Sequence, residues 1–174
     1  GEYIEKVLTG YHYQSYGNHC GLRIKYVNGY YFVFLGSNSN NSSGCYYGYA
    51  NDLSEEFTVV KMGSSGDFCD VIYDEKRKRY VHIMKTGSGS NYDCWLGFND
   101  DIASFTLGTL NLQNSSQGGY AEYFHRLGAK ENEYFPLFEY DAGTVNRKFV
   151  LQSVDADSFT KRDTLTLYDS LTSL

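Results

Sequence analysis

The chain has 174 residues, of which 17% are aromatic, and a formal net charge of −6 at pH 7. No run approaches the roughly 20 apolar residues that span a bilayer, and the basic run from Lys76 to Arg79 suits a charged hairpin tip better than a nucleic-acid surface. We therefore expect no membrane span and no nucleic-acid partner. Because the sequence starts at Gly1 rather than at Met, we expect a processed product or a fragment.

Strand-like runs alternate with turn residues from Cys20 onward, and residues 1–19 add one or two strands before them. In residues 20–68 the runs are rich in β-branched and aromatic residues, as is typical of β-strands. Asn28-Gly29 predicts a tight hairpin between two of these runs, because both residues tolerate a positive φ.

The pattern of residues 20–68 recurs in residues 69–119 and, more loosely, in residues 120–168. The best-matched positions are cysteines 49 residues apart: Cys20 with Cys69, and Cys45 with Cys94. Each copy also contains an Asp, then an aromatic residue four or five positions on, then Thr, which we expect to open the fourth strand. In the third copy we expect the first strand at Glu122–His125.

Four-stranded antiparallel repeats of this length fit two all-β architectures. In a β-propeller each repeat forms one blade, whereas in a β-trefoil three repeats complete a short barrel capped by hairpins. The number of repeats favours the trefoil, whereas their sequence motifs favour the propeller. In both cases residues 20–174 form a single domain that ends in a short tail.

Two runs carry a family resemblance. The run from Asp70 to Val81, DVIYDEKRKRYV, resembles the first two strands of a propeller blade, and the run from Asn51 to Thr58, NDLSEEFT, resembles the turn between its last two strands. Similar blades occur in arabinanase-like glycosidases and in phage tail propellers, and the resemblance covers about residues 20–165. Since three blades do not close a ring, it implies a second copy or further blades from a longer chain.

The same resemblance suggests positions for catalytic carboxylates. In arabinanase-like glycosidases these stand at the start of the innermost strands of the first three blades, which here are Gly21, Asp70 and Glu122. Glycoside hydrolysis needs a proton donor and a base or nucleophile, and Gly21 has no carboxylate to supply one. We therefore expect no enzymatic activity. A degenerate glycosidase that uses Asp70 and Glu122 is the alternative.

The four cysteines either pack as thiols or form disulfides. The pairs Cys20–Cys45 and Cys69–Cys94 would join first and third strands, which lie about 9–10 Å apart, beyond the roughly 7 Å reach of a disulfide. We therefore favour buried thiols and leave the disulfides open. Because no two cysteines lie close together in sequence, as they do in zinc sites, we expect no metal and no cofactor.

Aromatic residues flank a glycine at Gly48 and at Gly97, which are equivalent positions of the first two repeats. Exposed Tyr and Trp rings stack on sugar C–H faces, and neighbouring Asn and Asp side chains bind hydroxyl groups. The candidate ligand-binding residues are Tyr47, Tyr49, Asn51, Trp95 and Asp100.

These features predict a non-catalytic recognition module, with a glycan or glycoprotein surface as its partner. The alternative is a structural or receptor-binding component of a phage or virus particle. Both predict an extracellular or virion-associated protein, and the incomplete ring predicts a homo-oligomer or a larger assembly.

Overall fold

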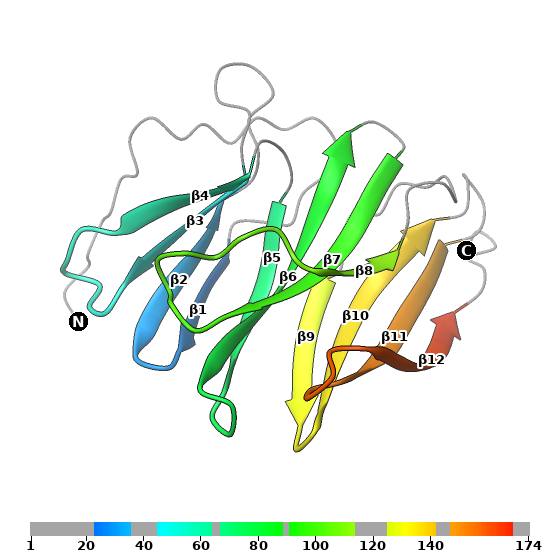
Figure 1. Cartoon of the computed structure of the whole chain (residues 1–174). Helices are drawn as coiled ribbons and strands as arrows, with labels where there is room; N and C mark the ends of the chain where they lie inside the picture. Colours follow the sequence, from blue (N-terminus) through cyan, green and yellow to red (C-terminus); the bar gives the residue numbers. More distant parts are fainter. Residues whose placement is uncertain are drawn as a thin grey trace.

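The computed structural model describes residues 23–35, 45–63, 67–88, 91–113, 125–141 and 147–168, and the regular elements in these ranges are β-strands (Figure 1). They form three four-stranded antiparallel sheets. The predicted all-β fold with three four-stranded repeats is therefore confirmed. The strands expected in residues 1–19 lie outside the described ranges.

Each sheet is a meander in which the spatial order of the strands follows the chain. Sheet 1 comprises β1 (Arg23–Val27), β2 (Tyr30–Leu35), β3 (Cys45–Ala50) and β4 (Thr58–Gly63). Sheet 2 comprises β5 (Asp67–Asp74), β6 (Arg79–Ser88), β7 (Asn91–Asn99) and β8 (Leu110–Gln113). Sheet 3 comprises β9 (His125–Lys130), β10 (Glu133–Asp141), β11 (Arg147–Asp155) and β12 (Lys161–Tyr168).

The hairpin between β1 and β2 turns at Asn28 and Gly29, whose φ angles are 48° and 84°. Two consecutive positive φ angles match the right-handed twist of the flanking strands. The predicted Asn-Gly hairpin is therefore confirmed. The basic run from Lys76 to Arg79 likewise forms the turn between β5 and β6 and the first residue of β6.

The repeated Asp-aromatic-Thr signature forms the turn between the third and fourth strands of each sheet. Its Asp accepts a hydrogen bond from the backbone N–H two residues on, at 2.8 Å for Asp52, 2.9 Å for Asp101 and 2.8 Å for Asp155. Short acidic side chains favour such turns. The expectation that the signature opens a strand is wrong at Phe105, which lies in the loop before β8. Of the strand expected at Glu122–His125, only His125 lies within the described residues, where it is the first residue of β9 (His125–Lys130).

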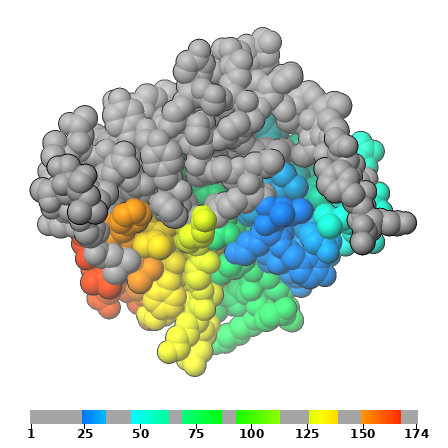
Figure 2. Space-filling view, turned by 180° about the vertical axis from the view of Figure 1, so that it is seen from behind, coloured from blue at the N-terminus to red at the C-terminus, as the bar shows by residue number. Residues whose placement is uncertain are grey.

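The sheets stack in chain order, with sheet 2 between the other two (Figure 1). Strand β5 contacts β1, β2 and β3 on one side and β9 on the other. From behind, the blue, green and yellow segments of the three sheets adjoin one another (Figure 2). Apart from Asp67 and Phe68 at the start of β5, each sheet contains residues of one repeat only, so this arrangement matches separate propeller-like blades, the first of the two expected architectures.

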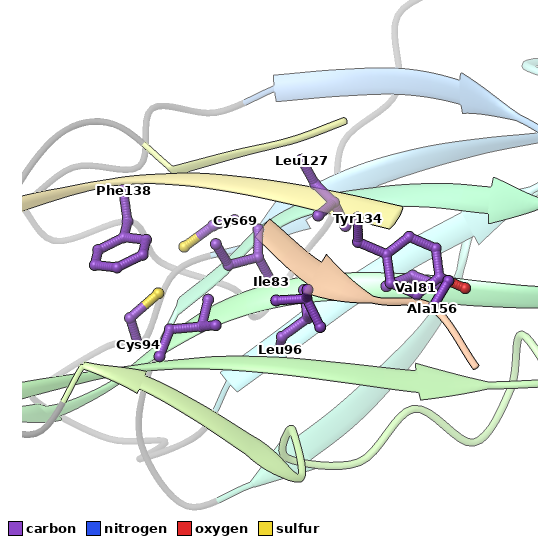
Figure 3. Packing of buried hydrophobic residues seen from close by; sticks show 11 residues of the cluster. Cys69, Val81, Ile83, Cys94, Leu96, Leu127, Tyr134, Phe138 and Ala156 are labelled. Carbon is purple, nitrogen blue, oxygen red and sulfur yellow. The ribbon is translucent and has the colours of Figure 1, made fainter. Parts of the chain in front are cut away.

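A hydrophobic core fills each boundary between sheets. The first core, between sheets 1 and 2, consists of Val27, Phe32, Phe34, Tyr47, Met62, Val71, Tyr80, Met84 and Phe105. The second core, between sheets 2 and 3, consists of Cys69, Val81, Ile83, Cys94, Leu96, Leu112, Leu127, Tyr134, Phe138, Val154 and Ala156 (Figure 3). Sheet 2 therefore buries both of its faces.

Two of the four cysteines belong to the second core. Cys69 lies on β5 and Cys94 on β7, and both thiols are buried in the second core, near Ile83 and Phe138 (Figure 3). The interpretation as buried thiols is therefore correct for the second repeat. Cys20 and the side chain of Cys45 lie outside the described part of the structure.

Candidate functional site

The predicted ligand-binding residues differ sharply in exposure. Tyr47 is 0% exposed, and its hydroxyl donates a hydrogen bond to the carbonyl of Ile102 and accepts one from the N–H of Phe105 at 3.3 Å. Burial raises the pKa of Tyr47 well above its ordinary value. Tyr47 is therefore a core residue that joins sheets 1 and 2, and the expectation that it presents a ring to a ligand is wrong.

The other four predicted residues lie nearer the surface. Tyr49 and Trp95 are half-buried beside the first core, and the indole N–H of Trp95 donates to Thr86 Oγ1 at 3.0 Å. Asn51 and Asp100 are exposed in the turns that follow β3 and β7. Of this set, Tyr49 lies beside further aromatic residues that the sequence did not single out.

These neighbours form what we call the tyrosine cluster: Asn28, Tyr30, Tyr49, Tyr73 and Tyr80. The rings of Tyr30 and Tyr49 meet edge to face at 6.0 Å between centroids, and those of Tyr73 and Tyr80 lie 4.9 Å apart. The amide nitrogen of Asn28 donates to the Tyr80 hydroxyl at 3.0 Å, which links the β1–β2 turn to β6. The cluster therefore draws side chains from both sheet 1 and sheet 2.

Strand geometry explains why these residues converge. Alternate residues of a strand share one face, so Tyr30 lies on the same side of β2 as Phe32 and Phe34, toward sheet 2. Tyr73 and Tyr80 are directly opposite each other in the β5–β6 ladder. Tyr30, Tyr49 and Tyr73 pack against the first core but are only half-buried as residues, unlike the fully enclosed Tyr47.

The tyrosine cluster, as defined above, contains no acidic or basic side chain. Burial raises the pKa of Tyr80 above its ordinary value, and the nearby phenols of Tyr30 and Tyr73 raise it further, although the hydrogen bond from Asn28 opposes the shift. Its hydroxyl therefore stays protonated and can donate a hydrogen bond while it accepts one from Asn28. The cluster thus combines aromatic faces with neutral donors and acceptors.

Asp70, the catalytic candidate in sheet 2, is buried at the junction of the three innermost strands. Its Oδ1 forms an ion pair with Lys25 Nζ of β1 at 2.8 Å and accepts from the N–H of Val71 at 2.9 Å. Its Oδ2 accepts from the N–H of Leu127 on β9 at 2.9 Å. Both oxygens therefore hold sheets together. Its expected partner, Glu122, lies outside the described residues, as does Gly21.

A polar cluster that the sequence did not predict joins sheets 2 and 3. Asp74 accepts hydrogen bonds from the Tyr134 hydroxyl and from Arg77, whose guanidinium also pairs with Asp157 at 2.7 Å. Arg79 donates to Tyr134 and lies 4.1 Å from the centre of the Phe98 ring. The basic run thus anchors one sheet to the next.

This polar cluster also shifts two pKa values. Burial opposes the change at Asp74, but hydrogen bonds from Tyr134 and Arg77 lower its pKa below the ordinary value. Burial and the hydrogen bond to Asp74 together raise the pKa of Tyr134 to about 12. These groups satisfy one another, which indicates a structural role.

In the described ranges, no three His, Cys, Asp or Glu side chains group closely enough to hold a metal ion. No described segment is a helix with the length and apolar character needed to cross a membrane.

Comparison with known protein families, with curated proteins and with solved structures found no significant match.

Proposed function

We propose that this chain is a non-catalytic recognition module that binds a glycan at the tyrosine cluster. The observation that carries this proposal is the convergence of three half-buried tyrosine rings, one buried tyrosine and an exposed Asn at the boundary of two sheets. Aromatic faces of this kind stack on the C–H face of a sugar ring, and the hydroxyl and amide groups can bind its hydroxyls.

Rigidity supports the same function. The rings rest on a stacked aromatic layer, in which Phe32 and Phe105 lie 6.1 Å apart with an interplanar angle of 11°. Side chains that are already ordered lose little conformational entropy when a ligand binds. A pre-formed aromatic site therefore suits ligands such as sugars, which make few contacts and bind weakly.

The absence of charge within the cluster narrows the ligand class. Its members are tyrosines and one Asn, which supply neither a cation for an acidic sugar nor an anion for an amine. We therefore propose neutral glycans as the ligands.

Titration calorimetry with the best neutral glycan from a glycan array tests the proposal. Tyr30→Ala and Tyr73→Ala should each weaken binding at least tenfold, equivalent to about 1.4 kcal/mol. Tyr46→Ala is the matched control, because Tyr46 is another half-buried tyrosine on β3 that contacts Lys61 rather than the cluster. A flat array, or equal losses for Tyr46→Ala and Tyr30→Ala, would refute the proposal.

The glycosidase alternative has a separate test. If Asp70 takes part in hydrolysis, the protein should release sugar from arabinan or fructan, and Asp70→Asn should abolish the release. The contacts of Asp70 with Lys25 and Leu127 support a structural role instead. We therefore expect no sugar release from either polymer.

A further inference from the structure

The two boundaries inside the chain show which residues a sheet uses to cover its successor. In sheet 2, Ile83 and Leu96 lie opposite each other on β6 and β7 and are buried against sheet 3. In sheet 1, Phe34 and Tyr47 form the corresponding pair on β2 and β3 and are buried against sheet 2. The second and third strands thus provide a large apolar pair at one register.

Sheet 3 repeats this face on its outward side. Leu137 on β10 lies opposite Leu151 on β11, and Leu151 lies opposite Leu165 on β12. Because Tyr134 and Phe138 of β10 point into the second core, the odd-numbered Leu137 points the other way. Leu137 and Leu151 are only half-buried, and Leu165 is 55% exposed. A row of three leucines therefore faces away from sheet 2.

Sheet 1 carries the complementary kind of face. In sheet 2, the face toward sheet 1 presents Val71 opposite His82, and both side chains are buried. The corresponding pair in sheet 1 is Ile24 opposite Val33, on the side away from sheet 2. Ile24 is 57% exposed there, and its neighbour Tyr26 is 61% exposed. The outward face of sheet 1 therefore corresponds to the face of sheet 2 that packs against sheet 1.

Charge also complements these two faces. Arg126 and Lys130 are exposed on β9, at the outward side of sheet 3. On sheet 1, the β3–β4 turn crosses the outward side, where Phe57 packs over Gly48, and it carries exposed Glu55 and Glu56. Inside the chain, one ion pair of this kind already bridges two successive sheets, between Arg77 in the β5–β6 turn and Asp157 in the β11–β12 turn.

We propose that the outward face of sheet 3 docks on the outward face of sheet 1 of a second copy, and that two copies close a ring. The occupant is a second copy because one chain carries both halves of the interface, at opposite ends of its stack of sheets. Two copies of three sheets give six, within the range of about four to eight blades in closed propellers. Such a head-to-tail interface closes into a ring when the rotation fits. The inference rests on the sheet faces and does not depend on glycan binding.

Light scattering on a sizing column tests the assembly directly. The full chain has a mass of 19.8 kDa, and we expect the eluting species to have twice that mass. A monomer at micromolar concentration would overturn the proposal, and so would a trimer or an open series of larger species.

Two variants then test whether the contact is head-to-tail. Leu165→Glu places a charge on the sheet 3 face, and Ile24→Glu places one on the sheet 1 face. Each variant alone should halve the measured mass, because every interface in the ring uses both faces. An equimolar mixture should regain a complex with one copy of each variant, since one of its two interfaces then joins two unaltered faces.

A symmetric contact through sheet 3 alone would give a different result. Leu165→Glu would then dissociate the dimer and Ile24→Glu would not, which would contradict the proposal. Leu107→Glu is the control, because Leu107 is 45% exposed but lies in the loop before β8 of sheet 2, which provides neither of the two faces. Circular dichroism confirms that each variant is folded. If Leu165→Glu or Ile24→Glu unfolds the chain, Leu151→Gln and Tyr26→Lys test the same two faces.

Discussion

The two boundaries between sheets are built differently. The boundary of sheets 1 and 2 is aromatic, with Phe32, Tyr47 and Phe105 stacked at its centre and the tyrosine cluster at its edge. The boundary of sheets 2 and 3 is mainly aliphatic, and its edge is closed by the ion pairs of Asp74 and Arg77. The polar groups of the second edge engage one another, whereas the first edge leaves tyrosine rings partly exposed. A ligand site is therefore better supported at the first edge.

The largest expected loss of stability comes from an aromatic position that recurs at both boundaries, Phe105 at the first and Phe159 at the second. Phe105→Ala should lower the free energy of unfolding by about 3–4 kcal/mol, because Phe105 is buried among Phe32, Tyr47, Tyr80 and His82. Phe159→Ala, at the equivalent position of sheet 3, should lower it by about 1–2 kcal/mol, because that ring is only half-buried. Urea unfolding followed by tyrosine fluorescence measures both. Equal losses would show that the boundaries do not differ in this way.

The boundaries should also respond to acid in different pH windows. Burial lowers the pKa of His82, at the first boundary, from 6.5 to about 4, although its hydrogen bond to the Thr106 carbonyl opposes the shift. The unfolded chain therefore binds this proton at a higher pH than the folded chain. The resulting stability is fully present above pH 6.5 and is lost as the pH falls to 4, by about 3 kcal/mol.

The second boundary should lose stability only at lower pH. The lowered pKa of Asp74 gives stability that is present above its ordinary value of 3.8 and is lost as the pH falls below it.

Urea unfolding of wild type and His82→Gln across pH 6.5 to 4 isolates the effect of His82, because other titrating groups cancel in the difference. If the two curves run parallel, His82 does not carry the acid response.

A glycine that recurs in sheets 1 and 2 gives a smaller difference in stability between these two sheets. A Cβ at position 97 would lie 2.6 Å from His82 Nε2 and 2.8 Å from the backbone of Gly108, so Gly97→Ala should cost about 1–3 kcal/mol. A Cβ at the equivalent position 48 would lie 3.5 Å from Phe57, an ordinary contact, so Gly48→Ala should change stability by less than about 0.5 kcal/mol. Thermal unfolding of the two variants checks the difference, and a larger loss for Gly48→Ala would contradict it.

Local sequence patterns predicted the strands well, because they depend on neighbours in the chain. The 49-residue repeat relates core positions such as Phe34 to Ile83 and Tyr47 to Leu96, and Asn28-Gly29 adopts the turn that its conformational freedom favours. The Asp of the closing signature does cap a turn, but the chain after Phe105 takes several more residues to reach β8. A short motif does not specify where the next strand begins.

The candidate site was harder to predict, since it depends on how sheets pack. Alternation along β3 places Tyr47 and Tyr49 on one face. The difference between them comes from the β7–β8 loop of sheet 2, which contacts Tyr47 and buries it, whereas Tyr49 is only half-buried. Asp70 similarly contacts Lys25 and Leu127, which come from the other two repeats. No local pattern contains these partners.

The smallest predicted effect compares two tyrosine hydroxyls at equivalent positions of β6 and β10. Tyr134→Phe should lower the free energy of unfolding by about 1–2 kcal/mol, because Asp74 and Arg79 both lose a partner at a buried hydroxyl. Tyr80→Phe removes only the contact with exposed Asn28 and should cost less than about 1 kcal/mol. Because the second edge is held by polar contacts and the first is open, Tyr80→Phe should affect glycan binding more than stability, whereas Tyr134→Phe should do the reverse. Urea unfolding and calorimetric titration of both variants measure these effects. If instead Tyr134→Phe weakens glycan binding and Tyr80→Phe does not, the ligand binds at the boundary of sheets 2 and 3.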